Sequence, residues 1–118
     1  MLQLPLLDGD TPVRRVLAVG AHADDIEIGC GATLLALQRV SELDVTWVVL
    51  AADGVREEEA RTSASTFLAG AASSTVVCHR FRDGYFPYVG GEVKDVFEEL
   101  KRELDPQVVL LLGMATKH

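Results

Sequence analysis

The sequence predicts an α/β fold in which a parallel sheet of about four strands carries helices on both faces. Two observations predict it. Short apolar runs at residues 16–20, 45–52, 75–78 and 108–112 alternate with segments whose apolar residues recur at helical spacing. The runs are apolar throughout, which is typical of parallel strands covered on both faces. Strands separated by helices indicate βαβ units, and the 118 residues predict a single domain.

The first half of the chain predicts a lead-in, a strand, a helix and a second strand. Residues 1–11 have the composition of an extended lead-in, and the apolar run at 16–20 predicts the first strand. Leucines and a valine at helical spacing predict a helix that starts at Gly31 and ends near Glu42. The run at 45–52 is rich in β-branched residues and predicts the second strand.

The middle of the chain predicts a turn, a helix, a strand and a long loop. The dipeptide at 53–54 is Asp-Gly, which is a turn signal. Three consecutive glutamates at 57–59 suit the positive end of a helix, which we expect to end at Gly70. A short third strand is expected at 75–78. Residues 79–91 then predict a loop with four aromatic side chains.

The last third of the chain carries the clearest amphipathic pattern. Apolar residues at i, i+3, i+4, i+7 and i+11 predict a helix from Val93 to Leu104. The dipeptide at 105–106 is Asp-Pro, which ends it. The fourth strand is expected at 108–112. Because this strand is apolar on both faces, an uncovered edge there predicts self-association, as a symmetric homo-oligomer.

Composition and charge exclude several classes of partner. The formal net charge is -7 and the pI is about 4.8, which argues against nucleic acid or an anionic membrane as the partner. Two cysteines, Cys30 and Cys78, make no disulfide framework and fit a reducing compartment. No apolar run reaches the roughly 18 residues of a membrane span, and no signal peptide is recognisable. We therefore expect a soluble, cytoplasmic protein.

The segment from Val16 to Gly31 has the composition of a functional site. It begins as a buried strand and ends at Gly29-Cys30-Gly31. Between these lie one histidine and three acidic residues: His22, Asp24, Asp25 and Glu27. Ligands of parallel sheets bind outside the carboxyl ends of the strands, where these residues are expected to lie. Packing alone does not select such a density of ionisable groups, so catalysis or metal binding is the first hypothesis.

The chemistry of this segment suits metal-assisted hydrolysis. His22 and Asp25, three residues apart on a tight turn, can point at one ion, and imidazole and carboxylate are usual ligands of Zn²⁺. The adjacent Asp24 is then free to take a proton from water. The alternative is structural: Asp24 or Asp25 caps the helix, and His22 is a half-buried polar side chain. The preceding strand and the following glycines favour a site.

Residues 21–34, Ala-His-Ala-Asp-Asp-Ile-Glu-Ile-Gly-Cys-Gly-Ala-Thr-Leu, resemble the signature of the LmbE-like (PIG-L) family of zinc-dependent deacetylases. That signature is Ala-His-Pro-Asp-Asp followed by a Gly-x-Gly-Gly-Thr helix start. The resemblance continues more weakly to Arg82-Asp83-Gly84 and covers the N-terminal part of the family's domain. It implies a Rossmann-like fold and a hydrolase that removes an acetyl group from a small-molecule amino-sugar conjugate of the N-acetylglucosamine type.

The resemblance implies a role for each matching residue. His22 and Asp25 would be the zinc ligands and Asp24 the general base. Arg61 matches a helix arginine that meets the substrate, and its alternative is a solvated helix charge. Asp83 matches an Asp-Gly loop residue near the sugar, and its alternative is an ordinary turn residue. Glu27 receives no assigned role beyond a supporting or capping one.

Three departures from the family pattern stand out. Ala23 replaces the proline of the signature, and Ala64 stands where many relatives have glutamate. The third zinc ligand of the family comes from a His-x-Asp-His segment after the fourth strand, which the chain does not reach. His118 is the candidate substitute, and the interpretation at this stage is a domain truncated on its C-terminal side. Two alternatives stay open: a non-catalytic small-molecule or nucleotide-binding domain, and an oligomer-forming domain with a vestigial metal site.

Overall fold

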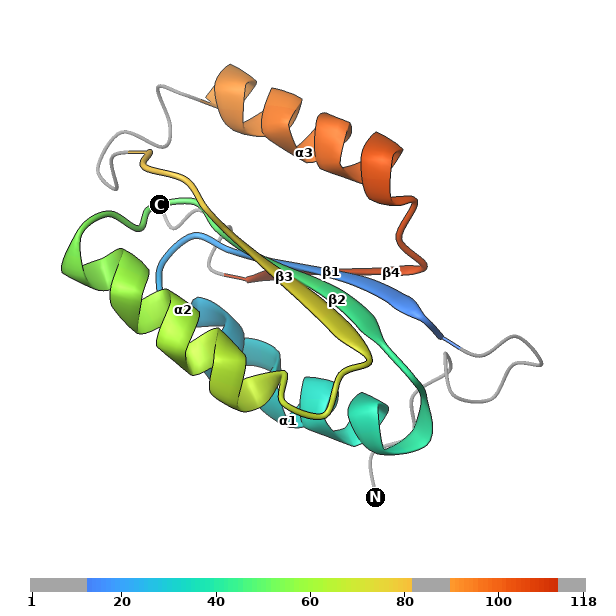
Figure 1. Cartoon of the computed structure of the whole chain (residues 1–118). Helices are drawn as coiled ribbons and strands as arrows, with labels where there is room; N and C mark the ends of the chain where they lie inside the picture. The colour runs from blue at the N-terminus through green and yellow to red at the C-terminus, as the bar shows by residue number, and fades with distance from the viewer. Residues whose placement is uncertain (1–12, 82–89, 113–118) are drawn as a thin grey trace.

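The computed structural model describes residues 13–81 and 90–112 of the 118. Along the chain, strands and helices alternate (Figure 1). The elements are β1 (Arg15–Gly20), α1 (Asp25–Val40), β2 (Asp44–Val49), α2 (Val55–Phe67), β3 (Ser73–Cys78), α3 (Gly90–Leu104) and β4 (Val108–Leu112). The predicted lead-in at 1–11 and most of the predicted loop at 79–91 lie outside the described residues.

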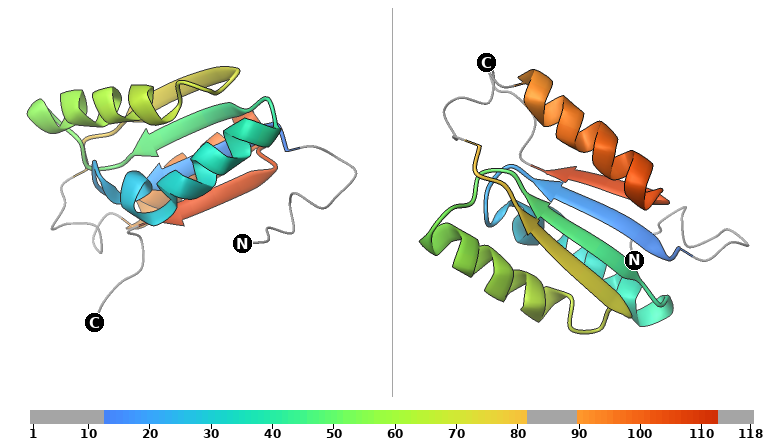
Figure 2. Two further views of the ribbon diagram at one scale, coloured as in Figure 1. Left: turned by 90° about the horizontal axis from the view of Figure 1, so that it is seen from below. Right: turned by 45° about the horizontal axis from the view of Figure 1, so that its top comes forward.

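The four described strands form one parallel sheet in the order β3-β2-β1-β4. Helices α1 and α2 run across one face of this sheet and α3 covers the other (Figures 1 and 2). The predicted Rossmann-like α/β fold, with about four parallel strands and helices on both faces, is therefore confirmed. Both β1 and β2 are buried at every position after their first residue, as their apolar sequences require.

The sheet divides the core into two layers. Under α1 and α2 the layer contains Trp47, Ile26 and Leu34, which are all fully buried. The layer under α3 is smaller and contains Leu17 and Val19 of β1, Val48 of β2, and Leu50 directly after β2. Apolar residues predicted for the last helix pack against this layer: Val93, Phe97, Leu100 and Leu104.

Helix α1 begins six residues before the predicted start at Gly31. Its first turn contains Asp25 and Glu27, whose charges suit the helix N-terminus. Cys30 has non-helical angles, with φ -147° and ψ 18°, so the helix is kinked there. The leucine pattern that predicted the helix belongs to the part after the kink, which is why the sequence missed the first turn.

The other boundaries differ from the prediction by a few residues. Strand β2 ends at Val49 instead of 52, because Ala51 pairs in an isolated antiparallel bridge with Arg80. Helix α2 begins directly after Gly54, whose φ of 54° favours glycine, and it ends at Phe67, before the predicted Gly70. Strand β4 has the predicted bounds. Among the described residues, no helix has the length and apolar character to cross a membrane.

Candidate active site at the carboxyl ends of β1 and β2

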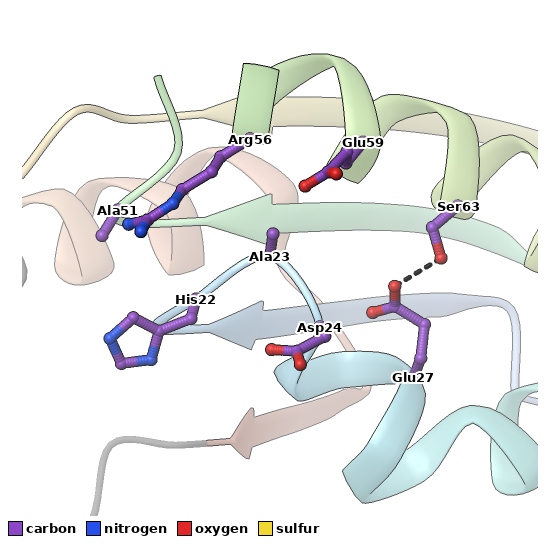
Figure 3. Close-up of a pocket in the computed structure, with 8 residues that line it drawn as sticks. All are labelled: His22, Ala23, Asp24, Glu27, Ala51, Arg56, Glu59 and Ser63. Carbon is purple, nitrogen blue, oxygen red and sulfur yellow. Dashed lines mark hydrogen bonds between the residues drawn. The ribbon is translucent and has the colours of Figure 1, made fainter. Parts of the chain in front are cut away.

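A pocket of about 570 Å³ lies beyond the carboxyl ends of β1 and β2, between α1 and α2 (Figure 3). One wall is the β1–α1 loop with the first turn of α1, and the other is the N-terminal half of α2. Eight residues line it: His22, Ala23, Asp24, Glu27, Ala51, Arg56, Glu59 and Ser63. The predicted site segment thus lies at the expected edge of the sheet.

Backbone hydrogen bonds fix the loop after β1. The Ala21 amide donates to the Leu112 carbonyl of β4 at 3.1 Å, and the Ala51 amide donates to the Ala21 carbonyl at 2.9 Å. The Asp25 amide donates to the His22 carbonyl at 3.2 Å, which closes a tight turn. The loop is therefore anchored to strands on both sides, and the side chains that follow it leave from a defined backbone.

The two predicted metal ligands lie next to each other. Asp25 Oδ2 accepts the backbone amide of His22 at 2.8 Å and lies 3.1 Å from the His22 Nδ1 atom. The exposed fractions of the two side chains are 36% and 22%, so both are accessible from solvent. The Asp25 carboxylate thus accepts the amide of His22 in the loop before α1 and holds this residue in place. The two side chains therefore contact each other, and their role as metal ligands stays a prediction.

Asp24 occupies the N-cap position of α1, but its side chain makes no capping hydrogen bond. It is exposed and its carboxylate lies in the pocket (Figure 3). The capping alternative for Asp24 therefore finds no support, and the carboxylate is available for other chemistry.

The donor types at this edge fit a zinc ion, since imidazole and carboxylate are its usual ligands. His22 and Asp25 supply one of each. Within residues 13–81 and 90–112, no group of three or more histidine, cysteine or acidic side chains could hold a metal ion. The third predicted candidate, His118, lies outside the described residues.

The wall formed by α2 was not predicted. Arg56, Glu59 and Ser63 follow one another at i, i+3 and i+7, which puts them on one face of the helix, and all three line the pocket. Ser63 Oγ donates a hydrogen bond to Glu27 Oε2 across the pocket (Figure 3). Polar residues at helical spacing, in a segment that directly follows a strand, are a sequence signal that could have identified this wall of the pocket.

Arg61 lies elsewhere on α2. Its Nε donates to Glu57 Oε2 at 3.0 Å and its Nη1 donates to the Val76 carbonyl of β3 at 3.1 Å. Glu57 has a second cationic neighbour, because Arg80 Nη2 lies 3.6 Å from Glu57 Oε1. The hydrogen bond from Arg61 lowers the pKa of Glu57, and the nearby Arg80 charge acts in the same direction. Arg61 is not among the residues that line the pocket, so its substrate role stays a prediction, as does that of Asp83 outside the described residues.

Two other titratable groups near this edge have shifted pKa values. Burial raises the pKa of the Cys30 thiol to about 11, and the negative charge of Glu27 adds to the shift. Burial lowers the pKa of His79, whose ring lies 5.8 Å from that of Phe81. Neither residue lines the pocket.

Comparison with known proteins decides the family. The model of the family described as "PIG-L: GlcNAc-PI de-N-acetylase" matches residues 17–118, which is most of the chain. The chain belongs to the PIG-L family. It is 36% identical over 69 residues to the "Uncharacterized deacetylase YaiS" of Escherichia coli (strain K12), over 53% of this chain and 37% of that protein. The chain thus spans little more than a third of that relative. No solved structure matches.

Proposed function

We propose that this PIG-L family protein is a metal-dependent N-deacetylase that hydrolyses the acetamide of an N-acetylglucosamine-type sugar conjugate. The observation that carries the proposal is the contact between His22 and Asp25, next to Asp24. The Asp24 side chain makes no capping hydrogen bond and lies in the pocket between α1 and α2. The family match supports the reaction class. The net charge of -7 supports a small molecule rather than nucleic acid as the partner. Both cysteines are free, which supports a reducing compartment such as the cytoplasm.

In the proposed mechanism, His22 and Asp25 would hold Zn²⁺, which when bound would supply Lewis acidity and would make water a better nucleophile near neutral pH. Asp24 accepts a proton from the attacking water, whose oxygen forms the new bond to the carbonyl carbon. The C–N bond breaks, the proton passes to the amine nitrogen, and acetate and the free amino sugar leave. The polar side chains of α2 face the substrate from the opposite wall.

The proposal predicts that replacing either of two neighbouring aspartates impairs a different property of the protein, turnover in one case and metal binding in the other. Asp24→Asn removes the proton acceptor and leaves both donors in place, so the protein should keep its metal while kcat falls by about 10²–10⁴-fold. Asp25→Asn removes a ligand and the acceptor of the His22 amide, so metal content itself should fall. The measurements are zinc content after dialysis and release of acetate from N-acetylglucosamine conjugates.

Asp44→Asn is the matched control, because Asp44 is an exposed aspartate at the opposite end of β2. It should change neither zinc content nor turnover. Equal loss of metal in Asp24→Asn and Asp25→Asn would show that the assigned roles are wrong.

A further inference from the structure

The first turn of α1 is separated from the rest of its helix by the kink at Cys30. This turn carries Asp25 and directly follows Asp24, so its position sets the position of both carboxylates. Its N-terminal end has no side-chain cap. A single helical turn is marginal by itself, because helix formation is cooperative and its nucleus is costly. Contacts with other elements must therefore hold it.

One such contact is the hydrogen bond between Glu27 and Ser63. It joins residues 36 positions apart and links the first turn of α1 to α2. The other oxygen of the carboxylate, Glu27 Oε1, is buried and has no hydrogen-bond partner within the described part of the chain. The Ser63 hydroxyl is therefore the partner the structure gives this carboxylate, and losing it would leave a charged group poorly satisfied.

The bond also joins the two faces that line the pocket. Glu27 and Asp24 are three residues apart on the α1 side, while Ser63 shares its helix face with Glu59 and Arg56 (Figure 3). The pair therefore connects the two walls at the pocket.

We propose that Glu27 is a positioning residue, which acts through Ser63 to hold the first turn of α1, so that Asp24 faces α2 across the pocket and Asp25 stays in contact with His22. The inference rests on the proposed function, in which these aspartates act. It gives Glu27 a role that the motif alone does not supply. Groups that orient metal ligands from behind typically change metal affinity about 10–100-fold when removed.

The test compares Ser63→Ala with Ser63→Thr, Glu27→Gln, Glu27→Ala and Thr66→Ala. Ser63→Thr keeps a hydroxyl, and Glu27→Gln keeps an acceptor. Thr66→Ala is the matched control, because it removes a hydroxyl of α2 that donates only to the Thr62 carbonyl of its own helix. Two quantities are measured on the whole chain: affinity for zinc by calorimetric titration, and hydrogen exchange of amides 25–29. The Ile28 amide, which donates to the Asp24 carbonyl at 3.2 Å, is the most direct probe.

Ser63→Ala should lower zinc affinity about tenfold and speed exchange of amides 25–29. Ser63→Thr and Glu27→Gln should fall between it and the unaltered protein, and Thr66→Ala should match the unaltered protein. Ser63→Ala combined with Glu27→Ala should lose no more affinity than the worse single variant, because both remove one interaction.

Additive losses would overturn the proposal, and so would a Ser63→Ala protein indistinguishable from Thr66→Ala. Faster exchange with unchanged zinc affinity would also overturn it, since the bond would then serve packing alone. If the unaltered protein bound no zinc, the proposed function would fail instead. The exchange comparison between Ser63→Ala and Thr66→Ala would still decide whether the bond holds the turn.

Discussion

Gly29 and Gly31 allow α1 to lie against its neighbours on both sides of the kink. A Cβ atom at Gly29 would lie 2.6 Å from Leu112 Cδ2 of β4, and one at Gly31 would lie 2.6 Å from Phe67 Cε1 of α2. Both distances are shorter than carbon atoms tolerate, so each glycine marks a close approach of two elements. The sequence indicated that these glycines let the backbone approach closely, and the structure identifies what approaches.

Gly31→Ala should destabilise the protein. The new methyl group must displace the Phe67 ring, which also lies 6.2 Å from the Trp47 ring, so we expect a loss of about 1–3 kcal/mol from overpacking. The measurement is urea denaturation. Gly91→Ala is the matched control, because a Cβ there meets nothing within 4 Å. In α3 that change should be neutral or stabilise by about 0.5–1 kcal/mol. Equal effects at the two positions would contradict the packing argument.

The Cys30 thiol should be inert in the folded protein. Because burial and the Glu27 charge raise its pKa from 9.0 to about 11, the thiolate at pH 8 is about a hundredfold scarcer than for an ordinary thiol. Alkylation by iodoacetamide, followed by mass spectrometry of the labelled peptides, should modify Cys30 more slowly than the less buried Cys78. Urea should abolish the difference, and raising the pH toward 11 should speed labelling of Cys30. Faster labelling of Cys30 than of Cys78 at pH 8 would refute the assignment.

At the scale of single elements, α2 divides its side chains between two neighbours. One face, with Arg56, borders the pocket. Arg61 reaches the backbone of β3 and, through Glu57, the side chain of Arg80. The predicted helix began at the glutamates 57–59, so it included Arg61 but not Arg56, and it did not show that the two arginines lie on different sides of α2. Which side meets the sheet depends on how α2 crosses from β2 to β3, and the weak periodicity of the segment does not encode it.

Alanine variants of the two arginines should separate these roles. Arg56→Ala should raise KM about tenfold with little change in stability, because it removes a charged hydrogen-bond donor from the pocket. Arg61→Ala should lower stability, because the Val76 carbonyl and the Glu57 carboxylate lose the hydrogen bonds that Arg61 donates to them. The KM of this variant should stay close to that of the unaltered protein. Thermal melting and steady-state deacetylation kinetics give the two quantities. A rise in KM for Arg61→Ala at unchanged stability would favour the substrate role that the family resemblance implies.

Across the whole molecule, local pattern was sufficient to predict the elements and their class. Apolar runs such as 108–112 and the spacing of α3 are local signals, and both elements were found with the predicted character. The residues around His22 carried their chemistry in a contiguous motif. The order β3-β2-β1-β4 and the α2 wall of the pocket could not be predicted this way. They depend on where each crossover places a helix, which is a property of the packed domain.

The same packing leaves an apolar border at β4. Among the described strands β4 pairs only with β1, so within this part of the chain its other edge has no strand partner, and such an edge can pair with a strand of another chain. Leu111 of β4 is 48% exposed, and Ile28 on the first turn of α1 is 78% exposed. Gly29, next to Ile28, packs on Leu112 of the same strand. Exposed apolar side chains thus lie on both sides of a strand edge that no other described strand pairs with.

We expect the 118-residue chain to self-associate through this border, as a symmetric dimer in which β4 lies near its counterpart. Light scattering over a concentration series should show the mass rising toward that of two chains. Leu111→Lys should shift the equilibrium toward the monomer, because a charge on an edge strand opposes pairing. Val55→Lys is the control, since Val55 is 69% exposed on α2, away from β4, and its replacement should leave the equilibrium unchanged. A strictly monomeric protein at high concentration, or equal effects of the two lysines, would refute the β4 interface.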